Sequence, residues 1–206
     1  MAELSDSELM VKFQQGNSHA FTLLFETYRG PVFNFIYRML NNQRDVAEDL
    51  LQEIFMKVAK ARDYYEPRAK FSTWLFALTR NHCLNHLKSR RYAQRLNTVS
   101  LHAEAQDGAS LMEVLPDERP ANGTLEQKET HAQLEQCIAS LPDEYKEVFL
   151  LRAVEGLALD DVSRILRQNP ATTRTHYHRA RLLLQKRMNQ LLAPEPTKTG
   201  TKEKPS

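Results

Sequence analysis

Residues 159–181 read LDDVSRILRQNPATTRTHYHRAR, and the predicted fold depends mainly on this segment. Apolar positions recur at three- to four-residue spacing on both sides of a short polar segment, residues 167–170. This spacing predicts two short helices, residues 159–166 and 170–192, joined by a brief turn. On the second helix an inward-facing stripe can pack on the first, and it consists of Thr173, Tyr177, Ala180 and Leu184. The pattern is typical of a helix-turn-helix.

The other side of the second helix carries hydroxyls, imidazole and guanidinium groups. Arginine pairs with guanine edges in the major groove, whereas further cations and hydroxyls hold phosphates. We therefore expect Arg174 to read a base and Arg179 and Arg181 to contact phosphate. The full expected DNA-binding set is Thr172, Arg174, Thr175, His178, Arg179 and Arg181. The alternative is a basic helix pair that packs against another protein.

Amphipathic helical patterns also precede this motif. They cover residues 20–40, 45–61 and 71–91, and helices resume at about Leu125 after a polar stretch with Pro116 and Pro120. The prediction is an all-α fold of two small helical domains joined by a flexible linker, with a helix-turn-helix as the C-terminal domain. The expected divisions are residues 1–96, a linker over 97–125, residues 126–192, and a disordered tail over 193–206.

The charge pattern indicates a polyanionic partner, although the formal net charge is only +2. No Asp or Glu occurs between Val162 and Pro194, where seven Lys and Arg residues lie: Arg164, Arg167, Arg174, Arg179, Arg181, Lys186 and Arg187. A second basic stretch runs from Arg62 to Arg95, and the sequence between the two is mainly acidic. Two separated basic regions favour two contacts with a nucleic acid.

Composition argues against several classes of protein. The 206 residues contain only six glycines, which are scattered, so neither a P-loop nor a dinucleotide-binding fingerprint occurs. Two cysteines, Cys83 and Cys137, do not make a disulfide framework and favour a reducing compartment. The N-terminus resembles no signal peptide and no run is apolar enough to span a membrane. We expect a cytoplasmic protein that is not an enzyme, requires no cofactor or metal, and does not insert into membranes.

Residues 71–91 carry a second expected DNA-binding face. Asn81, Asn85 and Lys88 fall at i, i+4 and i+7 and so share one side of a helix, on which amides can pair with base edges. Lys88 and Arg91 can hold phosphates. Trp74 is open to two interpretations, core packing or DNA contact. His82 and His86 could in principle bind zinc, but they follow the apolar stripe of the helix, which favours partly buried packing.

Several motifs, taken together, resemble the extracytoplasmic-function (ECF) sigma factors of the sigma-70 family. These motifs are LPDEYKEVFLLR at 141–152, EGL at 155–157, HRAR at 178–181, DVAEDLLQEIF at 45–55, and FSTWL at 71–75 with Arg80-Asn81. They stand in the family's order and spacing.

The resemblance implies a promoter-reading subunit of RNA polymerase. It implies that the N-terminal domain binds core polymerase and the −10 element. It also implies that the C-terminal domain binds the −35 element. Core polymerase would bind Asp49, Gln52, Glu53 and Met56. The −10 DNA would meet Lys70, Ser72, Thr73, Trp74, Asn81, Asn85, Lys88 and Arg91. An anti-sigma factor and a monomeric state on polymerase are also implied.

The chain departs from the family pattern in the helix-turn-helix. Arg167 stands where the family usually has glycine, and Thr173 replaces an aliphatic residue. Two alternatives remain: a free-standing helix-turn-helix regulator that does not bind polymerase, and a helical adaptor that does not contact DNA. The acid-free stretch of residues 162–194 argues against the adaptor.

Overall fold

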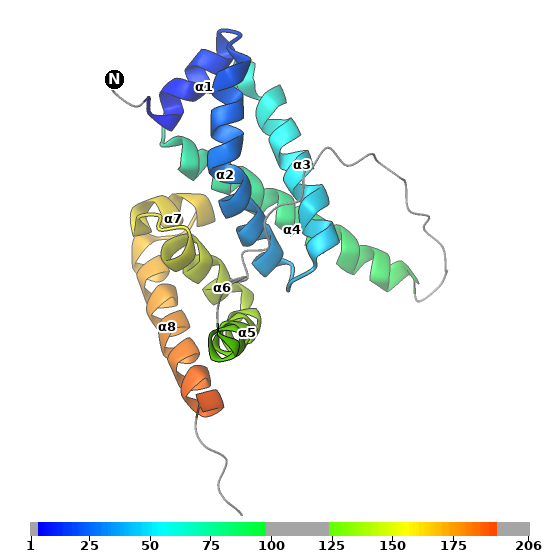
Figure 1. The fold of residues 1–206 in the computed structure, drawn as a ribbon, viewed down its shortest axis with the longest axis vertical. Helices are drawn as coiled ribbons and strands as arrows, with labels where there is room; N and C mark the ends of the chain where they lie inside the picture. The colour runs from blue at the N-terminus through cyan, green and yellow to red at the C-terminus, as the bar shows by residue number, and fades with distance from the viewer. Residues whose placement is uncertain (1–3, 98–123, 193–206) are drawn as a thin grey trace, which may run out of the picture.

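The structure, a computed structural model, describes residues 4–97 and 124–192. The N-terminal domain consists of α1 (Asp6–Gln14), α2 (Ser18–Met39), α3 (Arg44–Lys60), the 3-10 helix η1 (Arg62–Tyr64) and α4 (Phe71–Asn97). The C-terminal domain consists of α5 (Leu125–Ala139), α6 (Asp143–Phe149), the π-helical turn η2 (Leu150–Val154), α7 (Leu159–Leu166) and α8 (Pro170–Leu192). The predicted all-α, two-domain fold is confirmed (Figure 1).

Polar side chains fix where several helices begin. Ser5 and Glu8 form a capping box at α1: the Glu8 amide donates to Ser5 Oγ at 3.4 Å and the Ser5 amide donates to the Glu8 carboxylate at 2.7 Å. Thr124 and Gln127 form the equivalent pair at α5. Each box satisfies backbone donors that the first helical turn leaves without partners. The helix predicted over residues 71–91 extends to Asn97, since residues 92–97 contain neither proline nor glycine.

Aromatic and aliphatic side chains from four helices form the N-terminal core. Phe35 of α2 is fully buried and packs edge-on against Phe76 of α4, with ring centroids 5.7 Å apart. Leu51 and Ile54 of α3 are also fully buried. The C-terminal core is smaller and is built by buried residues that include Val148, Leu151, Val162 and Ala180.

The two domains contact each other directly. Helix α7 packs against α4, and α5 packs against α2. In Figure 1 the C-terminal helices lie together below α1 and beside the lower end of α2, and α4 crosses behind α2 and α3. This arrangement places the C-terminal domain beside the helix that carries the predicted −10 face.

Candidate nucleic-acid interface

The structure divides α8 into a buried and an exposed side, as the residue spacing predicts. Thr173 and Ala180 are fully buried and Leu184 is 6% exposed, while Tyr177 is partly buried. Helix α7, the first helix of the helix-turn-helix, contributes the buried residues Val162, Ile165 and Leu166 to this contact. All the expected DNA-binding side chains of the helix are exposed: Thr172, Arg174, Thr175, His178, Arg179 and Arg181.

The turn before α8 determines how the helix is presented. Arg167 ends α7 in the left-handed conformation, with φ 52° and ψ 43°. Asn169 then accepts the Ala171 amide on its side-chain oxygen at 2.8 Å, and its main-chain carbonyl accepts the Thr173 amide at 3.0 Å. Pro170 occupies the first helical position, where its missing N–H costs nothing. The turn therefore needs no glycine, although Arg167 adopts a conformation that glycine adopts more readily.

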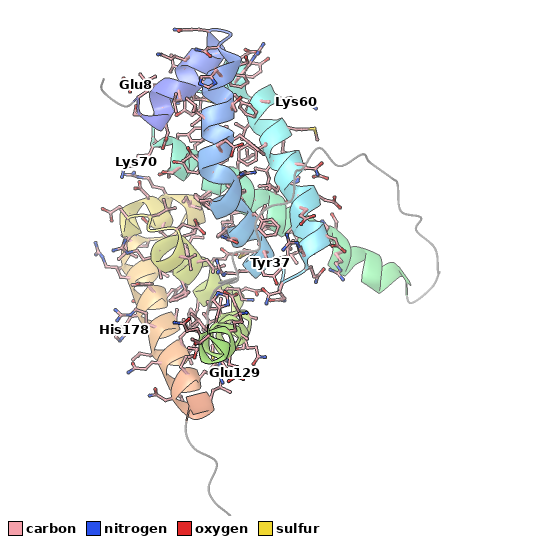
Figure 2. All side chains as sticks on the ribbon, viewed as in Figure 1. Glu8, Tyr37, Lys60, Lys70, Glu129 and His178 are labelled. Carbon is pink, nitrogen blue, oxygen red and sulfur yellow. The ribbon has the colours of Figure 1, made fainter. Side chains whose placement is uncertain are left out.

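The three arginines of α8 have different neighbours. Arg174 is 64% exposed and lies 4.0 Å from the Asp160 carboxylate. Arg179 donates to the Tyr145 hydroxyl at 3.4 Å, and the Arg181 guanidinium lies over the Tyr177 ring at 5.9 Å. Two of the guanidinium groups are thus oriented by aromatic neighbours, and Arg174 extends from the first turns of the helix. In Figure 2 the His178 side chain on the same helix points away from the protein.

The expected −10 face on α4 is exposed in its second half. Asn81, Asn85 and Lys88 all lie on the surface. The side chain of Arg91 falls outside the described residues. This half of the face offers amides and a cation to an incoming strand.

The first half of the same face is arranged differently. Lys70 donates to Asp161 of α7 at 3.3 Å, and Thr73 is only 5% exposed. Ser72 is partly buried. Trp74 is partly buried against the Tyr65 and Phe71 rings, with centroids 5.3 and 5.7 Å away. Trp74 therefore packs on the N-terminal core in this arrangement.

The outer side of α3 carries the residues expected to meet polymerase. Asp49, Glu53 and Met56 are exposed and Gln52 is partly buried. Met56 is 56% exposed, an unusually high value for a long apolar side chain in this protein. The inner side of the helix is buried through Leu50, Leu51, Ile54 and Val58, among others. The helix is thus amphipathic, with a mixed acidic and apolar outer face.

His82 and His86 do not form a metal centre in the structure. His82 Nε2 lies 2.5 Å from a Glu53 carboxylate oxygen, and His86 is partly buried. Among residues 4–97 and 124–192, no group of three or more His, Cys, Asp or Glu side chains could hold a metal ion.

Charged residues at the domain boundary carry contacts that the sequence analysis missed. Arg38 of α2 pairs with Glu135 of α5 at 2.9 Å, and Arg80 of α4 pairs with Glu147 of α6 at 2.7 Å. Lys146 is 3% exposed and donates to the Asn41 side-chain oxygen at 2.9 Å. Burial lowers the pKa of Lys146. Burial also raises the pKa of Glu147, although the nearby Arg80 charge acts to lower it. The two residues of each pair are 67 to 105 positions apart in the sequence. The spacing of residues within one helix therefore cannot predict these contacts.

Comparison with known families matches both domains. Residues 24–92 match Sigma-70 region 2, and residues 131–184 match Sigma-70 region 4. The ECF RNA polymerase sigma factor SigW of Bacillus subtilis is 30% identical, over 89% of this chain and 100% of that protein. The chain belongs to the ECF sigma factors. As a member of this family it is a non-enzymatic factor for transcription initiation.

Other relatives and solved structures are similar over most of the ECF sigma chain. The RNA polymerase sigma-H factor of Pseudomonas aeruginosa is 28% identical, over 93% of this chain and 98% of that one. Solved structures of CnrH with the cytosolic domain of CnrY, and of Bartonella quintana RpoE with the anti-sigma factor NepR, share its fold. The CnrH structure has a TM-score of 0.64 and 19% identity, and the match covers 90% of this chain and 97% of that one. The RpoE structure has a TM-score of 0.63 and 22% identity, and the match covers 82% of this chain and 96% of that one. No helix in the described ranges is long and apolar enough to cross a membrane.

Proposed function

We propose that this sigma factor binds core RNA polymerase through Asp49, Gln52, Glu53 and Met56, and directs promoter recognition and DNA melting for a stress- or signal-response regulon. Its N-terminal domain, residues 1–96, reads the melted −10 element. Its C-terminal domain, residues 126–192, reads the −35 element through the exposed side of α8. The factor acts as a monomer on polymerase.

The observation that carries this proposal is the presence, on both domains, of exposed polar and basic side chains of the kinds that contact DNA. Arg174 and its neighbours stand on α8, and Asn81, Asn85 and Lys88 stand on α4. Two modest contacts on one chain act together because the second binds at high effective concentration once the first has formed. Bases that leave the stack cost a few kcal/mol each, which contacts to amides and aromatic rings can offset without nucleotide hydrolysis.

The alternative regulator that acts without polymerase makes a different prediction. It requires the purified chain to bind duplex operators tightly by itself. The exposed, mixed acidic and apolar outer face of α3 favours the sigma factor, since a protein partner fits that face better than DNA does.

Control by an anti-sigma factor is part of the proposal. The CnrH and RpoE structures are complexes with CnrY and the anti-sigma factor NepR, and their folds match over most of the chain. The same kind of partner is expected here.

Run-off transcription tests the proposed function. Core polymerase supplemented with this chain should start transcription at discrete sites on genomic fragments that core polymerase alone ignores. The Met56→Lys variant should lose this activity, because it places a charge on the proposed polymerase contact. A chain that neither binds core polymerase in a pull-down nor supports such initiation would end the proposal.

A further inference from the structure

One of the two carboxylates on the outer face of α3 is held by a residue of a different helix. His82 Nε2 of α4 lies 2.5 Å from Oε2 of Glu53. Lys57 stands four residues beyond Glu53, the spacing at which glutamate and lysine commonly pair, yet the carboxylate pairs with His82. Asp49 on the same face makes no ion pair or side-chain hydrogen bond with any residue that the structure describes. The two carboxylates therefore differ in how firmly they are placed.

The contact leaves Glu53 available to a partner protein. A carboxylate only accepts hydrogen bonds, so His82 Nε2 is the donor. The His82 side chain is 17% exposed and the Glu53 side chain is 51% exposed, so the imidazole is largely enclosed while the carboxylate faces outward. His82 contacts Oε2 alone, and Oε1 can therefore accept a hydrogen bond from a second molecule.

The hydrogen bond benefits each of its two residues in a different way. A ring that is mostly removed from water needs a partner for its N–H, and the Glu53 carboxylate supplies one. In return, the bond restricts the rotamers of a long side chain that would otherwise sample several. Binding to a partner normally has to immobilise such a side chain, which lowers affinity. A glutamate that is already held in place avoids most of that loss.

We infer that His82 is a positioning residue of the polymerase-binding surface: its hydrogen bond fixes the Glu53 carboxylate in the orientation in which Glu53 binds core polymerase. The inference rests on the proposed function, which places Glu53 on that surface. The restraint of Glu53 by His82 is testable without polymerase.

The affinity of full-length variants for core polymerase, measured by fluorescence anisotropy, is the first test. His82→Leu removes the donor but keeps a side chain of similar size, and it should weaken binding about three- to ten-fold. His82→Gln offers an amide N–H in place of the imidazole N–H and should restore most of the affinity. His86→Leu makes the same change one turn further along α4, at another partly buried position, and should bind as wild type does.

A double-mutant cycle separates positioning from a general loss of structure. In a Glu53→Ala background, His82→Leu should have no further effect on polymerase affinity, because the carboxylate that it positions is gone. In an Asp49→Ala background, His82→Leu should weaken binding by the same factor as in wild type. A merely structural role would weaken binding equally in both backgrounds.

NMR relaxation of selectively carbon-13-labelled glutamate measures the restraint in the free chain. The Glu53 side chain should be more ordered in wild type and in His86→Leu than in His82→Leu. Circular dichroism and urea unfolding should show that all variants are folded. If His82→Leu does not fold, His82→Ala removes the same donor and allows the same comparisons.

Three results would overturn the inference. The first is a polymerase affinity of His82→Leu equal to that of His86→Leu. The second is an equal loss of affinity from His82→Leu in the Glu53→Ala and Asp49→Ala backgrounds. The third is a Glu53 side chain as mobile in wild type as in His82→Leu. A wild-type chain that does not bind core polymerase would instead end the proposed function and the polymerase role of His82 together, with the relaxation result intact.

Discussion

His82 of α4 and Glu53 of α3 are joined side chain to side chain, with Nε2 of His82 2.5 Å from a Glu53 carboxylate oxygen. His82 is 17% exposed and Glu53 is 51% exposed, so the histidine holds an acidic group that faces outward. This contact connects the helix proposed to read DNA with the helix proposed to bind polymerase. It also gives His82 a structural role that accounts for it without a metal.

The outer face of α3 yields the first prediction. Met56→Lys should weaken binding to core polymerase at least ten-fold, because Met56 is exposed and offers an adaptable apolar contact. The free energy of unfolding should change by less than about 0.5 kcal/mol, as is usual at surface positions. Binding is measured by fluorescence anisotropy and stability by urea unfolding.

The control variant is Leu23→Lys, the same kind of change at a 42% exposed position of α2, and it should bind polymerase normally. Equal affinities for the two variants would remove Met56 from the interface.

Arg174 and Arg181 should differ in what they contribute to −35 recognition. Arg174→Ala should lower affinity by about 1–3 kcal/mol for the preferred −35 sequence and flatten the preference at one base pair. Arg181→Ala should weaken binding to all sequences and reduce the dependence on salt, because a phosphate contact carries no sequence information. Binding selection from a randomised −35 library, with polymerase present, measures both profiles. Identical profiles for the two variants would show that this division of roles is incorrect.

Helix positions could be predicted from the sequence where a helix buries a periodic apolar stripe. The expected helices 159–166 and 170–192 agree with α7 and α8, and the stripe from Thr173 to Leu184 is on the inner side. Proline and asparagine at 169–170 mark the turn through purely local effects.

The contacts between domains could not be predicted in this way. Arg80 and Glu147 are 67 residues apart, and each looks like an ordinary exposed charge in its own helix. Their pairing depends on how α6 and α7 lie against α4, which no local pattern encodes. Thr73 is only 5% exposed, and the helical spacing of residues 71–91 carries no sign of this burial.

The left-handed residue at the end of α7 gives a stability prediction. Arg167 has a φ of 52°, at which a side chain costs about 1 kcal/mol relative to glycine. Arg167→Gly should therefore be more stable than Arg167→Ala by about 1 kcal/mol, since both remove the charge and only glycine relieves the backbone. Thermal and urea unfolding of the two variants measure this difference. Equal stability would mean that the backbone at this position relaxes when the side chain is shortened.

The buried thiol of Cys83 gives a prediction about reactivity and pH. Burial raises the pKa of this thiol from 9.0 to about 12, and the Glu147 charge adds to the rise. At pH 8 only roughly one thiol in ten thousand is then ionised, and the thiolate is the reactive form. In a Cys137→Ala background, Cys83 should react with a disulfide reagent far more slowly than a cysteine introduced at the exposed Ser89 of the same helix.

The sign of the linkage follows from the raised pKa. The folded state holds the Cys83 proton more tightly than the unfolded state, so this contribution to stability is complete below about pH 9 and declines as the pH approaches about 12. Urea unfolding of wild type and Cys83→Ala over this range isolates the effect, because all other titrating groups are shared. The stability of wild type should fall relative to Cys83→Ala as the pH rises above 9. If the difference in free energy of unfolding between wild type and Cys83→Ala stays constant over this range, the thiol titrates normally. If Cys83 in the folded protein reacts as fast as the cysteine at position 89, the thiol is accessible.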